Sequence, residues 1–87
     1  MTAFRIRFTR HALDAMERRA IPAEWVEKTI SAPDAIEPDP AGGGLLRAWR
    51  ALPEAGGRSL RVVHRHEDPD IVVVVVTVFL DRGRESR

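Results

Sequence analysis

The sequence of 87 residues predicts a single α+β domain, residues 1–87, in which an antiparallel sheet carries a pair of helices on one face. Three observations support this fold class. Two segments with helical periodicity follow each other near the N-terminus. Most of the remaining chain consists of β-prone runs joined by short turns, and the last run, Ile71 to Leu80, is rich in valine. The elements follow one another in the order β-α-α-β-β-β-β, and the short connections between the strands favour antiparallel neighbours.

Local signals set the boundaries of each element. Apolar residues alternate with arginines at the N-terminus, which predicts a strand over residues 3–8. Thr9 is a typical N-cap for a helix over residues 10–19, and Pro22 suits the first turn of a second helix over residues 22–31. The other expected strands cover residues 35–37, 45–52, 60–64 and 71–80, with turns over 38–44, 53–57 and 67–70 and a frayed end over 81–87. The valine-rich strand is apolar on both faces, which predicts a central place in the sheet.

Composition excludes several classes of protein. The chain has no cysteine, so disulfides, thiol nucleophiles and cysteine-ligated zinc are ruled out. The N-terminal residues lack the apolar core of a signal peptide. The longest apolar run has about half the length of a membrane-spanning helix. These features predict a cytoplasmic protein without a membrane partner.

The net charge of +1 is divided into blocks along the chain. Residues 1–21 and 44–66 carry net charges of +3 and +4, whereas residues 22–43 and 67–87 carry −4 and −2. If the two basic blocks meet in space, a cationic face forms on a nearly neutral protein. In the alternative arrangement, basic and acidic blocks pair as surface ion pairs that contribute little energy.

The first predicted helix carries the residues that most suggest contact with phosphate, namely Arg10, His11, Arg18 and Arg19. His11 lies in the first turn, where the helix dipole disfavours the protonated ring, so a neutral imidazole able to act as a base is expected. The alternative is a ring that ties the helix to the sheet. Arg19 borders the apolar stripe, where it either contacts a phosphate or caps the helix end.

Two polar residues interrupt apolar strand faces. Arg50 alternates into a face with Leu46, and His64 into a face with Leu60. Neither suits a plain core, which makes both candidates for catalysis; the alternative is an irregular edge strand, or an arginine that reaches the rim.

Trp49 is placed to stack on a base beside Arg47 and Arg61, as in proteins that bind single strands, or else to fill the core. No cofactor and no metal site are expected, although His64 and His66, followed by two acids, could in principle bind a divalent ion.

One set of residues, spread over most of the chain, resembles a family of short bacterial proteins known as domain of unknown function 4258. The resemblance rests on Arg10-His11-Ala12, Met16, Arg19, Ile21, Glu24, Val26, Pro33-Asp34, Leu60-Arg61-Val62-Val63 and Val75-Val76-Thr77-Val78-Phe79. That family looks similar to the BrnT and RelE-type toxins, small ribonucleases encoded beside an antitoxin. The resemblance implies metal-independent RNA cleavage on a four-stranded sheet, with His11 as base or phosphate binder, Arg19 as a phosphate or structural contact and Arg61 as a clamp on the transition state.

The residues and the resemblance favour a toxin-like, metal-independent ribonuclease. RNA cleavage without a metal needs a base, an acid and a cation, which His11 or His64 and Arg50 or Arg61 would supply. One alternative is a non-catalytic module that docks nucleic acid or an acidic protein on its cationic face. Another is a small regulatory subunit whose edge strand pairs with itself or with another chain. RNA, an antitoxin protein and a second copy of the chain are therefore the candidate partners.

Overall fold

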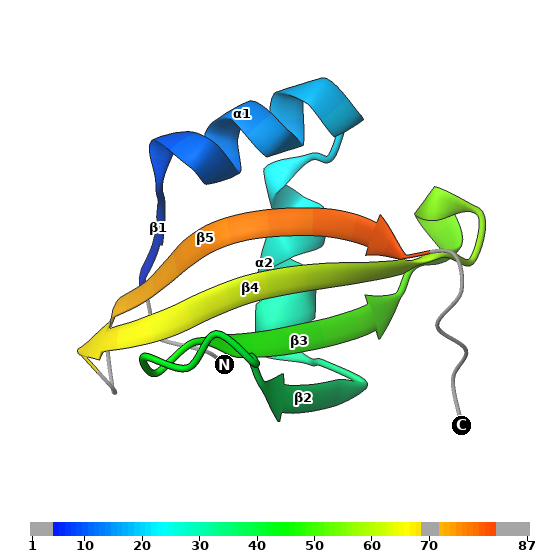
Figure 1. The fold of residues 1–87 in the computed structure, drawn as a ribbon. Coiled ribbons are helices and arrows are strands. Elements are labelled where there is room, and N and C mark those ends of the chain that lie inside the picture. The colour runs from blue at the N-terminus through cyan, green and yellow to red at the C-terminus, as the bar shows by residue number, and fades with distance from the viewer. Residues whose placement is uncertain (1–4, 69–71, 82–87) are drawn as a thin grey trace.

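The computed structural model describes residues 5–68 and 72–81, and within them five strands form one sheet that packs against two α-helices (Figure 1). The α+β class is confirmed. The elements are β1 (Arg5–Phe8), α1 (Arg10–Arg19), α2 (Ala23–Ser31), β2 (Ala35–Pro38), β3 (Leu46–Ala51), the short 3-10 helix η1 (Pro53–Ala55), β4 (Ser59–Asp68) and β5 (Val72–Asp81). Residues 3–4 of the first expected strand, the expected turn at 69–70, the first residue of the valine-rich strand and the expected fraying at 82–87 lie outside the described residues.

The sheet is mixed, with the strand order β1-β5-β4-β3-β2. β1 runs parallel to β5, with Arg5 opposite Val72 and Phe8 opposite Val75, whereas every other neighbouring pair is antiparallel. The expectation of a purely antiparallel sheet is therefore wrong at the β1 edge. β4 is the middle strand, and the valine-rich β5 is interior but not central. No short turn joins β1 to β5, so local turn signals could not fix the direction of this pair.

Thr9 fixes the start of α1 and ties it to the sheet. Its side-chain oxygen accepts a hydrogen bond from the backbone N–H of Ala12 at 3.0 Å, as expected for an N-cap, and donates to the carbonyl of Val76 at 2.9 Å. Its backbone N–H donates to the carbonyl of Val75 at 3.0 Å. The first helix therefore continues directly from the pairing of β1 with β5.

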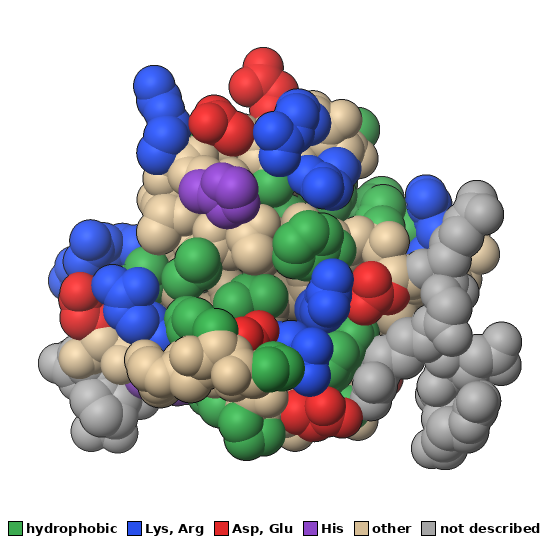
Figure 2. Space-filling model, viewed as in Figure 1, with side chains coloured by type: hydrophobic (Ala, Val, Ile, Leu, Met, Phe, Trp, Pro, Cys, Tyr) green, Lys and Arg blue, Asp and Glu red, His purple; other side chains and the backbone are tan. Residues whose placement is uncertain are grey.

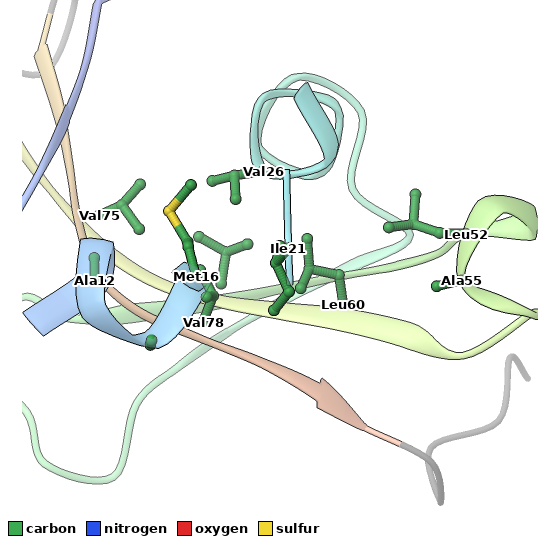
Figure 3. Close-up of a cluster of buried hydrophobic side chains, with 11 residues drawn as sticks. Ala12, Met16, Ile21, Val26, Leu52, Ala55, Leu60, Val75 and Val78 are labelled. Carbon is green, nitrogen blue, oxygen red and sulfur yellow. The ribbon is translucent and has the colours of Figure 1, made fainter. Parts of the chain in front are cut away.

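Both helices bury their apolar sides in one cluster on one face of the sheet, which confirms the predicted helical pair. Ala12 and Met16 of α1 and Val26 of α2 meet Leu60 of β4 and Val78 of β5 in this core (Figure 3). In Figure 1, α2 lies behind the sheet and α1 lies along β5. The opposite face of the sheet carries no helix in the part of the chain that is described; we call it the open face.

The open face consists of the side chains that alternate with those of the core. Cross-strand register places them in rows that run across the sheet. They include Arg5 and Arg7 of β1, Arg47 and Trp49 of β3, Arg61, Val63 and Arg65 of β4, and Val74, Thr77, Phe79 and Asp81 of β5.

Candidate nucleic-acid interface

Arginine side chains lie on aromatic rings at one end of the open face. Trp49, Arg61 and Phe79 face one another in register across three neighbouring strands. The Cζ atom of Arg61 lies 4.4 Å from the centroid of the Phe79 ring. The other two guanidiniums come from outside this row: Arg47 lies 5.1 Å from the Trp49 ring, and Arg19, at the end of α1, lies 5.2 Å from the Phe79 ring. With Asp81, these residues form what we call the arginine platform: Arg19, Arg47, Trp49, Arg61, Phe79 and Asp81.

Asp81 lies among these cations and links two of the strands. The indole N–H of Trp49 donates to its Oδ2 atom at 3.0 Å, and the Nε atom of Arg61 lies 3.4 Å from the same oxygen. The side chains of Arg61 and Asp81 are each 26% exposed, so this ion pair is in contact with solvent. The platform is therefore preorganised by ring contacts and by one internal carboxylate.

Other acidic side chains compensate part of the positive charge of the open face. Arg47 lies 3.5 Å from a carboxylate oxygen of Glu37 and 3.9 Å from one of Asp39. Glu67 pairs with Arg7 at 2.6 Å and lies 4.0 Å from Arg65. Arginines from both basic blocks do meet in space, and acidic residues pair with several of them. Both predicted arrangements of charge are thus realised on the same face.

The two aromatic residues of the platform differ in exposure. Trp49 is only 4% exposed, so its ring is covered and supports Arg47 from within the sheet rather than offering a surface for a base. Phe79 is partly exposed and is contacted by two guanidiniums. A planar guanidinium can stack on a ring and still donate to a phosphate from its edge, which suits this arrangement to a polyanion.

The remaining basic residues predicted on α1 are all exposed. Arg10, His11 and Arg18 lie on the surface of the helix. Figure 2 shows a histidine and basic side chains over α1 on the same side of the molecule as the hydrophobic and basic side chains of the open face. The end of α1 is closed by backbone bonds from Ala20, in the left-handed conformation, and from Ile21, so Arg19 is not needed as a cap.

Arg50 and His64 lie on the face that packs against the helices, opposite Arg61. Arg50 donates from Nη1 to the carbonyl of Ala32, the C-cap residue of α2, at 2.6 Å. This contact satisfies a carbonyl at the helix C-terminus, where a cation is favoured. The structure therefore does not bring together the four residues predicted for catalysis, His11, Arg50, Arg61 and His64.

His64 is 3% exposed and sits in register between Leu46 and Val75. Burial lowers the pKa of this imidazole, and the nearby His66 lowers it further, whereas a contact of Nδ1 with the Val62 carbonyl, at 3.2 Å, opposes the shift. The two histidine rings meet edge to face at 5.7 Å. Within residues 5–68 and 72–81, no three His, Asp or Glu side chains are grouped closely enough to hold a metal ion.

Sequence reasoning missed Phe79 and Asp81 as members of the site. Both belong to β5, where they alternate onto the open face with Thr77. The strand expected over residues 71–80 was interpreted only as core, and the expectation that Asp81 lies in a frayed end is wrong, because Asp81 pairs with Ser59 of β4. The alternation of an aromatic and an acidic residue at the end of an apolar strand was the available signal. Their contact with Trp49 depends on the order of β3, β4 and β5, which local patterns do not give.

Neither α1 nor α2, the two α-helices of the described residues, is long and apolar enough to cross a membrane. Comparison of the chain with curated proteins and with solved structures found no match. Residues 8–80 match the model of the family described as Domain of unknown function (DUF4258), and this match takes in most of the chain, from the end of β1 almost to the end of β5. The chain therefore belongs to the Domain of unknown function (DUF4258) family.

Proposed function

We propose that the protein binds single-stranded RNA across the open face, with the arginine platform as the main contact. The observation that carries this proposal is the placement of Arg19 and Arg61 on the Phe79 ring, beside Arg47 on Trp49. Because no helix of the described residues covers this face, a flexible RNA has room to lie flat on it, and the stacked guanidiniums offer hydrogen-bond donors to its phosphates. Arg10 and Arg18 extend the basic surface along α1.

A binding measurement with matched charge changes tests this proposal. A labelled single-stranded RNA would be titrated with the protein in the presence of a chelator, with fluorescence anisotropy as the readout. Arg61→Gln is expected to weaken binding about tenfold, because it removes a guanidinium that contacts phosphate directly. Lys28→Gln is the control, since it removes one positive charge from α2, on the other side of the sheet, where Lys28 pairs with Glu54.

Salt provides a second measure of the same contact. If three arginines neutralise phosphates, the logarithm of the binding constant should fall with the logarithm of salt concentration with a slope of about −2. Arg61→Gln should reduce the size of that slope, and Lys28→Gln should leave it unchanged. Equal affinities for the wild type and both variants, or no binding at all, would contradict the proposal.

A second function, metal-independent cleavage of RNA, is favoured by one observation. His11 is an exposed imidazole on α1, and a histidine over α1 shares one side of the molecule with the open face (Figure 2). In this reading His11 takes the proton of the 2′-hydroxyl while its oxygen attacks the phosphorus, and Arg61 stabilises the negative charge that develops on the phosphoryl oxygens. The bond from phosphorus to the 5′-oxygen then breaks, and the leaving oxygen takes a proton from the protonated His11 or from water. His64 has no part in it, because that ring is buried on the other face.

Cleavage is tested with the same RNA and chelator, by following its length on a gel. His11→Ala should abolish the cleavage while leaving RNA binding within about twofold, because the substitution removes the base and keeps the arginines. Cleavage that is absent from the wild type would leave binding as the function of the open face, and cleavage that persists unchanged in His11→Ala would rule out His11 as the base. If the cleavage depends on His11, an antitoxin protein is expected to cover this same face.

A further inference from the structure

Asp81 holds an unusual place, because it is a carboxylate set among the cations of a surface proposed to bind a polyanion. Its Oδ2 atom accepts the indole N–H of Trp49 and lies 3.4 Å from Nε of Arg61. These contacts put a negative oxygen where Arg61 would otherwise contact a phosphate.

The guanidinium groups of Arg61 and Arg19 both retain donors for a further anion. The Nε atom of Arg61 is buried, yet it has no hydrogen-bond partner within the described residues, so its contact with Asp81 is electrostatic only. Arg19, on the same Phe79 ring, has no carboxylate partner in residues 5–68 and 72–81. A larger anion with several oxygens could satisfy both side chains better than one carboxylate does.

We propose that the Asp81 carboxylate occupies the binding site of an RNA phosphodiester group, which we call the phosphate site. The phosphate binds between Arg19 and Arg61, beside the Phe79 ring, and displaces Asp81 from Arg61. This inference rests on the proposed RNA-binding function and adds its site and its control. Asp81 competes with the phosphate for Arg61. A phosphate that contacts both Arg19 and Arg61 displaces Asp81. A ligand that contacts Arg61 alone binds little more strongly than Asp81 does, and so does not displace it.

Asp81→Asn tests the competition directly, because it removes the charge and keeps an oxygen that can accept the Trp49 N–H. Binding of the labelled RNA should become about fivefold tighter, the factor that corresponds to breaking one partly exposed ion pair. The matched control is Glu67→Gln, which makes the same charge change beside Arg7 and Arg65 on the same face. This control should tighten binding by less than about twofold, since Arg7 and Arg65, the arginines that it releases, lie outside the arginine platform that makes the main contact.

Adding Arg19→Gln to Asp81→Asn tests whether the gain in RNA affinity comes from the proposed phosphate site or from a general effect of charge. The double variant should lose the gain, because the phosphate then contacts only Arg61. Urea unfolding of each variant checks that the fold is kept.

The outcomes distinguish the proposed phosphate site from the proposed function. If RNA binding depends on Arg61 but is no tighter in Asp81→Asn than in Glu67→Gln, the phosphate site is wrong and the RNA-binding function is still supported. A gain in affinity that survives the loss of Arg19 also contradicts the phosphate site. Failure of the wild type and of every variant to bind RNA overturns both.

Discussion

Arg61 on β4 lies over the ring of Phe79 on β5, in register with it, at 4.4 Å from Cζ to the ring centroid. On the other neighbouring strand Arg61 is in register with the buried Trp49. Because the Arg61 side chain lies on the Phe79 ring and beside the Asp81 carboxylate, it has already lost part of its freedom, so binding a phosphate costs it less entropy than it would cost an unrestrained surface arginine. This preorganisation makes Arg61, rather than the more exposed basic residues of α1, the centre of the candidate interface.

Phe79→Leu should weaken RNA binding about fivefold, because the Phe79 ring orients two guanidiniums and each such contact contributes about 0.5–1 kcal/mol at an exposed site. The free energy of unfolding should change by less than about 1.5 kcal/mol, since leucine keeps much of the apolar surface. Anisotropy and urea unfolding measure the two effects separately. Leu13→Ala, on the exposed part of α1, serves as a control for loss of exposed apolar surface. Unchanged RNA affinity in Phe79→Leu would show that the ring has no part in binding.

Arg50→Met should lower the free energy of unfolding by about 1 kcal/mol, because the hydrogen bond to Ala32 is exposed and water can replace part of it. The Ala32 carbonyl at the end of α2 loses its donor, while methionine keeps the aliphatic stem. RNA affinity should stay within about twofold of the wild type, because Arg50 lies on the face opposite the platform. Chemical denaturation followed by circular dichroism is the measurement. If Arg50→Met has normal stability but binds no RNA, Arg50 takes part in RNA binding and this prediction is wrong.

Acid should destabilise the protein through His64. Burial lowers the pKa of this imidazole in the folded state, so the unfolded chain binds more protons than the folded chain as the pH falls below the ordinary histidine value of about 6.5. Stability is therefore fully present above that value and declines as the pH falls, until the folded state is also protonated. His64→Gln should lack this part of the pH dependence. Urea midpoints measured between about pH 5 and 8 test the prediction.

His66→Gln is the matched control for that experiment, because His66 is exposed on the same strand. It should retain most of the wild-type pH dependence. Identical pH profiles for the wild type and His64→Gln would mean that His64 is not the group that titrates.

Ala20→Gly should stabilise the protein by about 0.5–1 kcal/mol. Ala20 closes α1 with φ 54° and ψ 49°, a left-handed conformation that costs a residue with a Cβ about 1 kcal/mol and costs glycine almost nothing. The greater freedom of glycine in the unfolded chain offsets part of the gain. Thermal unfolding should show a raised midpoint. A lowered midpoint would indicate that a contact of the Ala20 Cβ stabilises the fold by more than the left-handed backbone conformation destabilises it.

The sequence predicted both helices closely, because their signals are local. Thr9 marks the start of α1 where the structure places it, and α2 begins one residue after Pro22. The extent of β4 was predicted less well: a strand was expected over residues 60–64 and a turn from residue 67, whereas β4 runs from Ser59 to Asp68. The direction of β1 was missed because its partner, β5, lies at the other end of the chain, and pairing at such a separation leaves no pattern in either strand.

For the candidate site, alternation along the strands already separated Arg50 from Arg47 and His64 from Arg61. What the sequence could not decide was which of the two faces the helices would cover, or which strands would be neighbours. Helix packing placed His64 and Arg50 behind the sheet, and strand order brought Phe79 and Asp81 beside Arg61. Periodicity within an element depends only on adjacent residues, whereas the platform depends on register across three strands and on a helix end that reaches β5. The sequence by itself determined the elements and their two-sided patterns; the tertiary structure alone decided which arginines would share one surface.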